Sequence, residues 1–553
     1  MLYCIHNAAG FGAGIRENPM STILTYILIT LACLLRTCAA GFSYIPILDD
    51  SIQLISLPSS QNYAALIEQQ GLLATRPLAG LSDLYFTGRF SNLFIPALLY
   101  SALFGVAGVL FYHLFHRYFH TGHAFTVLFS LLPLGVEGTY WLAASTRIVP
   151  GLLFTALAAL VLDDFITRGG FWRVLLFAPL SLLSFSFYEQ ILALSLTLSA
   201  LQFLAYVRHN KRAFAAFIAL LMAAAYFAFT AQFASKGTVG SRMELAFPTT
   251  FAYYTKYFLP ELLRQIGAAF LKGGSLTLFR GFVRGILSSA SVGGVLYLIL
   301  SAAAGTALFI LLRPASKTAV TPLRPVAYPL IWGILLALAP VSPYFVIANP
   351  WFSMRACVPA FVGIGLILDL ACRALFRREM LYNGVCAVMC TVFLIAGASE
   401  VRDYQTTARM DQTVAEEILA HADQMSGRVG LLCVEEFPLA QQNYAYHEHI
   451  ASAGASEWAL YGKIVAVCRH ELDFAPVPLA TKGFSFYRGW NRDIKRISGF
   501  DQVWAWNANS SALVQLDVRM TGTHDADLYL PDGTLFARIW EEPDEIGYVQ
   551  ILP

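Results

Sequence analysis

The sequence predicts a mainly α-helical protein: a polytopic bundle of about eleven transmembrane helices, followed by a small α+β domain outside the membrane. Two observations predict the bundle. Of the 553 residues, 57% are hydrophobic and only 13% are charged, roughly half the charged share of ordinary soluble domains. The apolar residues also gather in runs of about 20, the length of helix that crosses the hydrocarbon core of a bilayer. The net charge of +2, without a basic stripe, argues against a nucleic-acid partner.

Short polar loops separate most of the candidate membrane-spanning runs. The first run is long and lacks a well-placed cleavage site, which favours a retained anchor; the small residues of "TCAAG" leave a signal peptide as the alternative. The runs cover residues 21–41, 91–112, 124–143, 148–165, 172–187, 190–207, 213–234, 288–312, 325–347, 356–375 and 381–398.

Lys and Arg in the short loops set the expected orientation of the bundle. They concentrate in loops such as "VRHNKR" and "RALFRRE", which are therefore assigned to the cytoplasm with the N-terminal segment 1–20. We expect a multi-pass protein of the bacterial inner (plasma) membrane with its C-terminus outside. Two long outer loops follow, 42–90 and 235–287. The second contains "FAYYTKYFLPELLRQIGAAFL", which is typical of an amphipathic helix lying in the membrane interface.

The transmembrane domain over 21–400 gives way to an extracytoplasmic domain over 401–553, where the composition becomes that of a soluble protein. A helix over 411–425 precedes a strand-like run, "GLLCVEEF", and "VQLDVRM" alternates as a half-buried strand does. A hairpin is expected at "PDG" in "LYLPDGTLFARI". Cys433 and Cys468, both in strand-like runs, either form a disulfide or remain buried free thiols.

Ionisable residues at the outer ends of the predicted helices are candidate functional residues, because placing charge near the membrane interior is costly. A carboxylate can accept the proton of an attacking hydroxyl, and guanidinium groups can hold a phosphate as it leaves. Positive charge preorganised there stabilises the transition state. Such a set suits group transfer from a lipid phosphate to an alcohol, and it comprises Asp49, Asp50, Arg76, Glu137, Trp141, Arg147, Glu189 and Arg355.

Several of these residues also have a purely structural interpretation. Asp50 could cap the helix that "SIQLI" begins. Glu189 could pair locally with an arginine. Three arginines could reach lipid phosphates at the membrane surface, namely Arg36, Arg147 and Arg355.

Metal binding has simpler alternatives at each place where the sequence suggests it. A solvated interfacial face explains the four histidines near the end of the second helix better than a metal site does, and a polar turn explains "THDADLY". Cys386 and Cys390 are expected to be buried thiols in an apolar helix. The histidines are His113, His116, His120 and His123.

The order of several motifs resembles polytopic glycosyltransferases of the type C superfamily, especially bacterial glucosyl transferase II-like and mannosyltransferase-like membrane proteins. These motifs are "PILDD" after the first helix, "ATRPLAG" in the first outer loop, "PLGVEGTYWLAAST", "SFSFYEQ" and the arginine of "PWFSMRACVPA". The resemblance covers about residues 20–400.

That resemblance implies a polyprenyl-phosphate-linked sugar as donor and a glycan, lipid or protein acceptor on the outer side. It implies that an acid of the first outer loop is the catalytic base, for which Asp50 is favoured, with Asp49 positioning the acceptor or a metal. Arg355 matches the place where the donor phosphate is held, with Arg76 and Arg147 as further candidates. Glu137, Glu189 and Trp141 would support the site. Because some relatives use a divalent cation and others do not, a metal requirement stays open.

Two other functions remain alternatives. A transporter or flippase of lipid-linked glycans would line its path with the arginines and couple protons to the carboxylates. A polysaccharide polymerase would take a pyrophosphate-linked donor and depend on arginines of the large outer loops. The second loop carries four of these, Arg242, Arg264, Arg280 and Arg284.

Overall fold

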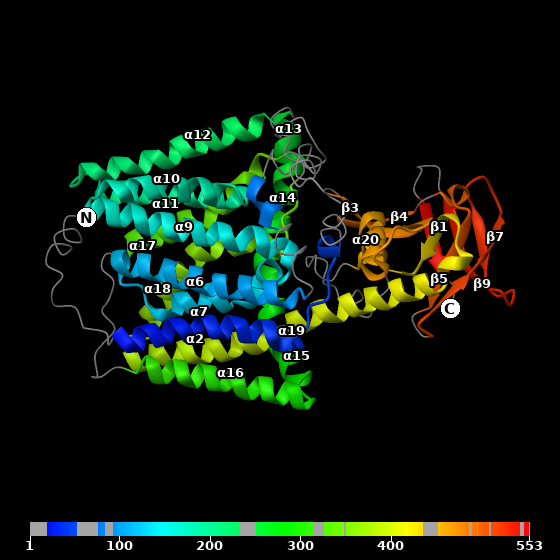
Figure 1. Ribbon diagram of the computed structural model, residues 1–553, viewed down its shortest axis with the longest axis horizontal. Coiled ribbons are helices and arrows are strands. Elements are labelled where there is room, and N and C mark those ends of the chain that lie inside the picture. The colour runs from blue at the N-terminus through cyan, green and yellow to red at the C-terminus, as the bar shows by residue number, and fades with distance from the viewer. Residues whose placement is uncertain are drawn as a thin grey trace.

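The computed structural model shows a helical bundle joined by one long helix to a smaller domain of helix and sheet (Figure 1). It describes residues 19–51, 76–82, 92–232, 250–313, 326–347, 350–434, 452–485, 489–494, 496–507, 510–541 and 547–551. Within this described part, eight helices are long and apolar enough to cross a membrane. The chain is therefore a multi-pass membrane protein by helix length and composition.

The bundle helices run side by side along the long axis of Figure 1. Large apolar side chains make the core between them: the Phe129 ring stacks on Phe104 at a centroid distance of 4.9 Å and lies tilted against Phe111 at 5.6 Å. The helices are α2 (Pro19–Thr37), α6 (Phe94–Phe119), α7 (His123–Leu131), α8 (Val136–Tyr140), α9 (Leu142–Arg168), α10 (Phe171–Phe185), α11 (Glu189–Tyr206), α12 (Phe217–Ala231), α16 (Val292–Leu311), α17 (Ala327–Leu338), α18 (Phe361–Leu375) and α19 (Glu379–Ala420).

Each predicted run falls on helix, but three of the eleven do not give one long membrane-spanning helix. The run over 124–143 is divided into α7 and α8 by a 3-10 turn at Pro133–Gly135. Proline lacks the N–H group that a continuing helix would need, which explains the break. The runs over 172–187 and 190–207 become α10 and α11, which are not among the eight. The count of eleven therefore stays a prediction.

The predicted amphipathic helix of the second outer loop is confirmed as helix. Alternating α and π turns run from α13 (Phe251–Tyr253) through α14 (Leu259–Gly267) to α15 (Gly281–Leu287). In Figure 1 this stretch lies across the bundle axis, at the end facing the C-terminal domain. Leu262 is fully buried while Leu263 is 52% exposed, so Leu262 packs on the bundle and Leu263 is directed outward.

The predicted boundary at residue 400 lies inside a helix. Helix α19 continues for 42 residues from the bundle into the C-terminal domain. Its later part packs Val414 and Ile418 into the domain core, on the helical face that the sequence predicted. One continuous helix therefore connects the two parts of the molecule.

The described residues of the C-terminal domain form three small sheets and helix α20 (Glu457–Cys468). In the first sheet, β1 (Gly427–Leu432) is parallel to β2 (Phe474–Pro478) and β5 (Gln502–Asn507), and β5 pairs antiparallel with β6 (Ala512–Gln515). A second, antiparallel sheet has the order β10 (Gly547–Ile551), β9 (Leu535–Glu541), β8 (Ala526–Tyr529) and β7 (Asp517–Met520). In the third sheet, β3 (Ala480–Ser485) pairs antiparallel with β4 (Gly489–Ile494).

Three sequence expectations for this domain can be scored. The hairpin at "PDG" is confirmed by the antiparallel pairing of β8 with β9, and Gly533 has the positive φ (85°) that such a turn uses. The strand expected around Cys468 is wrong, since this residue ends α20. Cys433 and Cys468 are both free thiols, so the disulfide alternative is also wrong.

Candidate functional site

Asp50 accepts several hydrogen bonds at the end of the bundle that faces the C-terminal domain. Its side chain is fully buried. The Tyr44 hydroxyl donates to Oδ2 (2.6 Å), as does the Ile47 N–H (3.2 Å), and the Ala143 N–H donates to Oδ1 (2.8 Å). The Tyr44 hydroxyl in turn accepts from the Leu142 N–H (3.0 Å). We call residues 44–51 the acidic segment.

These contacts show that Asp50 caps helix α9, while the cap expected for the helix of "SIQLI" falls on residues that, after Ser51, lie outside the described part of the chain. Leu142 and Ala143 are the first two residues of α9, whose N–H groups have no partner within the helix. Tyr44 and Asp50 supply the missing acceptors from a segment about 90 residues away. The positive end of the α9 dipole also favours a carboxylate at this place.

The environment of Asp50 makes its protonation sensitive to pH near neutrality. Burial raises the pKa of Asp50 to about 7, even though the hydrogen bonds from Tyr44, Ile47 and Ala143 lower it and the Asp49 charge raises it further. A carboxyl group with this pKa changes its charge in the physiological range, whereas an ordinary aspartate does not.

Because the pKa of Asp50 is higher in the folded than in the unfolded chain, its ionisation opposes folding. Below about pH 4 the carboxyl is protonated in both states, and between about pH 4 and 7 only the folded state holds the proton. We therefore expect the free energy of unfolding of wild type, relative to Asp50→Asn, to fall by on the order of 4 kcal/mol from about pH 4 to pH 8. Denaturation of both proteins in detergent across this range measures the difference, and a difference independent of pH would contradict the raised pKa.

Asp49 differs from Asp50 in exposure and contacts. Its side chain is partly exposed, and within the described part of the chain no group donates a hydrogen bond to it. The residue before it, Leu48, has a φ of 41°, a left-handed conformation that is strained for a branched side chain. This sharp bend separates the buried Ile47 from the turn that presents Asp49 at the surface of the site.

Trp141 connects the acidic segment with Arg355. The indole Nε1 donates to the Ile47 carbonyl (3.3 Å), and the Arg355 guanidinium carbon lies 5.1 Å from the indole ring centroid. The Arg355 backbone N–H donates to Oε1 of Glu137 (3.1 Å), which is fully buried in α8. Glu137 and Trp141 therefore fix both the backbone and the side chain of Arg355, which is itself partly exposed.

Arg76 joins this site from the segment between α2 and α6. Its Nε donates to both carboxylate oxygens of Glu189 (2.8 and 3.1 Å), and its guanidinium carbon lies 4.4 Å above the Tyr188 ring. The expected pairing of Glu189 with an arginine is thus confirmed. Tyr344 interacts electrostatically with Tyr188 and with both Arg76 and Arg355. Arg76 and Arg355, two of the three predicted phosphate-binding arginines, therefore lie close to each other.

The remaining candidates are less closely tied to this place. Arg147 is partly exposed and lies one turn beyond Ala143 in α9. Arg36 does not reach the membrane surface, because it is buried and donates to the Ser130 carbonyl (3.1 Å) and the Thr139 hydroxyl (3.0 Å). The snorkelling interpretation is therefore wrong for Arg36.

The groups considered for metal binding have other partners. His116 contacts the Thr121 carbonyl (2.8 Å), and His113 lies 3.0 Å from an Arg117 nitrogen. In the part of the chain that is described, no three His, Cys, Asp or Glu side chains are arranged to hold a metal ion. Whether the function needs a divalent cation stays open.

The C-terminal domain contacts the acidic segment directly. Lys463 of α20, only 3% exposed, donates from Nζ to the Pro46 carbonyl (3.1 Å). Ala459 belongs to the same apolar core as this end of the bundle. Burial lowers the pKa of Lys463, and the charges of Asp411 and Asp50 raise it. The two parts of the molecule therefore meet at the candidate site.

Sequence reasoning missed several residues that build the site. Tyr44 stands two residues before "PILDD" and Tyr188 lies within "SFSFYEQ", so those motifs could have indicated them. Tyr344 and Lys463 had no such signal, because only the fold brings them to the site.

Comparison with protein-family models and with curated proteins finds no match to this chain.

Proposed function

We propose that the protein is a membrane glycosyltransferase that moves a sugar from a polyprenyl-phosphate donor to a hydroxyl of an acceptor glycan, lipid or protein. In the proposed orientation, the end of the bundle that faces the C-terminal domain lies outside the cytoplasm. The observation that supports the proposal most is that Trp141 contacts both the acidic segment, through the Ile47 carbonyl, and Arg355, which interacts with Tyr344 as Arg76 does. The carboxylates of the acidic segment and the two guanidinium groups are those needed to deprotonate a hydroxyl and to hold a leaving phosphate.

The geometry favours Asp49 as the general base over Asp50, which the sequence resemblance had favoured. A base must come within hydrogen-bond reach of the proton that it accepts. Asp50 is fully buried and occupied by three donors, while Asp49 is partly exposed. In this proposal Asp50 is a positioning residue that anchors the acidic segment to α9.

The proposed step transfers the sugar in a single displacement. The acceptor oxygen forms a bond to the anomeric carbon as the bond from that carbon to the phosphate oxygen breaks. The acceptor proton goes to Asp49, and polyprenyl phosphate leaves with the bonding electron pair. Arg355 and Arg76 stabilise the negative charge that grows on the phosphate, and the membrane holds the polyprenyl chain.

The polymerase alternative is less well supported by the contacts. It depends on arginines of the second outer loop, yet Arg264 pairs with Glu261 (2.6 Å) and Arg284 pairs with Asp403. Arg280 is exposed and Arg242 lies outside the described residues. These ion pairs already engage two of the four guanidinium groups that would hold a pyrophosphate.

A transfer assay tests the proposal. Purified protein in detergent is incubated with polyprenyl-phosphate hexoses, each radiolabelled in the sugar, and with cell-envelope glycans and lipids as acceptors. We expect label from at least one donor to enter an acceptor fraction. Donors that stay intact with every acceptor fraction would contradict the proposed activity.

A further inference from the structure

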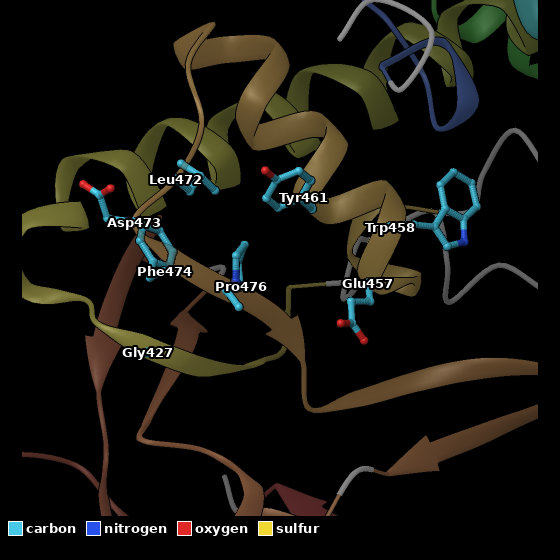
Figure 2. Close-up of a pocket in the computed structure, with 9 residues that line it drawn as sticks. Gly427, Glu457, Trp458, Tyr461, Leu472, Asp473, Phe474 and Pro476 are labelled. Atoms are coloured by element: carbon cyan, nitrogen blue, oxygen red, sulfur yellow. The ribbon is translucent and has the colours of Figure 1, made fainter. Parts of the chain in front are cut away.

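The C-terminal domain has a pocket of about 810 Å³ between α20 and β2. This volume lies within the range of roughly 300–1,000 Å³ that is typical of small-molecule sites. Figure 2 shows Tyr461, Phe474 and Pro476 around the pocket, with the carboxylates of Glu457 and Asp473 on opposite sides. The remaining lining residues are Gly427, Trp458, Leu472 and Ala475.

The lining shows which ligand chemistry fits. Trp458 and Tyr461 are 48% and 37% exposed, so both rings are accessible to a ligand. The negative faces of such rings attract the polarised C–H groups on one face of a sugar ring. The carboxylates of Glu457 and Asp473 are acceptors for hydroxyl groups. None of the nine lining residues is basic, so the pocket favours an uncharged ligand over an anionic one.

Helix α20 separates the pocket from the candidate catalytic site. Tyr461 and Lys463 are two residues apart in α20, so their side chains leave nearly opposite sides of the helix. Lys463 contacts the Pro46 carbonyl in the acidic segment, while Tyr461 lines the pocket. A helix with its side chains is about 10–12 Å across, so a chain of several sugar rings bound in the pocket can extend around α20 toward Asp49.

We propose that this pocket binds a neutral oligosaccharide, namely a segment of the acceptor glycan upstream of the hydroxyl that receives the new sugar. The biological role of the pocket rests on the proposed glycosyltransferase function. The binding of an oligosaccharide does not depend on that function. The exposed aromatic rings carry the stacking interaction, and Glu457 and Asp473 orient the hydroxyl groups.

Titration calorimetry on the purified full-length protein tests the proposal without any donor. The probes are neutral gluco-, manno- and galacto-oligosaccharides of three to six units, with oligogalacturonate and a proline-rich peptide as comparators. We expect at least one neutral oligosaccharide to bind more tightly than both comparators. Tyr461→Ala and Trp458→Ala should each weaken that binding about tenfold, and Tyr461→Phe should retain it.

The matched control is Tyr529→Ala, which removes a partly exposed tyrosine from β8, outside the pocket. It should leave binding unchanged. No binding by any neutral probe, tighter binding of a comparator, or binding that survives both pocket substitutions would overturn the proposal. The two proposals can fail separately. If no sugar transfer is detected but Asp49→Asn still binds the oligosaccharide, the catalytic proposal is wrong and the oligosaccharide site is supported.

Discussion

Asp49→Asn is expected to reduce sugar transfer about 10²–10⁴-fold, the usual contribution of a positioned general base. Asparagine has nearly the same size as aspartate but cannot accept the acceptor's proton at neutral pH. Because Asp49 is partly exposed and receives no hydrogen bond from the described residues, the substitution should leave the fold intact. The measurement is the initial transfer rate at saturating donor, together with the thermal unfolding midpoint.

Two further variants separate catalysis from stability. Asp423→Asn changes an exposed aspartate in the turn after α19 and should affect neither rate nor midpoint. Asp369→Asn alters a fully buried aspartate that accepts from the Tyr382 hydroxyl and the Gly122 N–H (2.9 Å), much as Asp50 accepts from Tyr44 and Ala143. It should lower the midpoint while leaving the rate per folded molecule unchanged. Full activity in Asp49→Asn would refute its role as base.

Arg355→Ala is expected to lower the transfer rate about 10²–10³-fold, as the loss of one preorganised donor to a developing charge does in other enzymes. The loss should appear mainly in kcat, because the charge on the leaving phosphate grows toward the transition state. Arg355→Lys should recover only part of the rate, since an ammonium group cannot bind two phosphate oxygens in the planar geometry of guanidinium.

The matched control for Arg355 is Arg519→Ala. Arg519 lies over the Tyr529 ring with its guanidinium carbon 4.3 Å from the centroid, much as Arg355 lies 5.1 Å from that of Trp141. Removing it deletes a similar cation–π contact in the C-terminal domain and should leave transfer unchanged. An equal loss of rate in both variants would mean that the Arg355 effect is structural.

The bundle was predictable because each membrane-crossing helix needs a long apolar run, which a sequence displays directly. The break at Pro133 was predictable in principle, since proline ends or kinks helices. The continuity of α19 was not, because the residues after position 400 are polar but still form helix readily. The strand expected at Cys468 was wrong because a short apolar run suits a helix and a strand equally well, so the sequence could not distinguish them.

Part of the candidate site was also predictable. The outer-end charges pointed to Arg76, Glu189 and Arg355, and the fold brings these to one place. The burial of Asp50 was not predictable, because its partners are backbone N–H groups at the start of α9 and the hydroxyl of Tyr44. Contacts of this kind depend on tertiary structure and leave no spacing pattern in the sequence.

The fate of the donor tests the central claim most directly. The protein is reconstituted into vesicles that contain a polyprenyl-phosphate hexose, an acceptor fraction is added outside, and the lipids are analysed by mass spectrometry. A glycosyltransferase converts the donor to free polyprenyl phosphate only when the acceptor is present, and Asp49→Asn prevents the conversion. A donor that keeps its sugar when the acceptor is present would contradict the account.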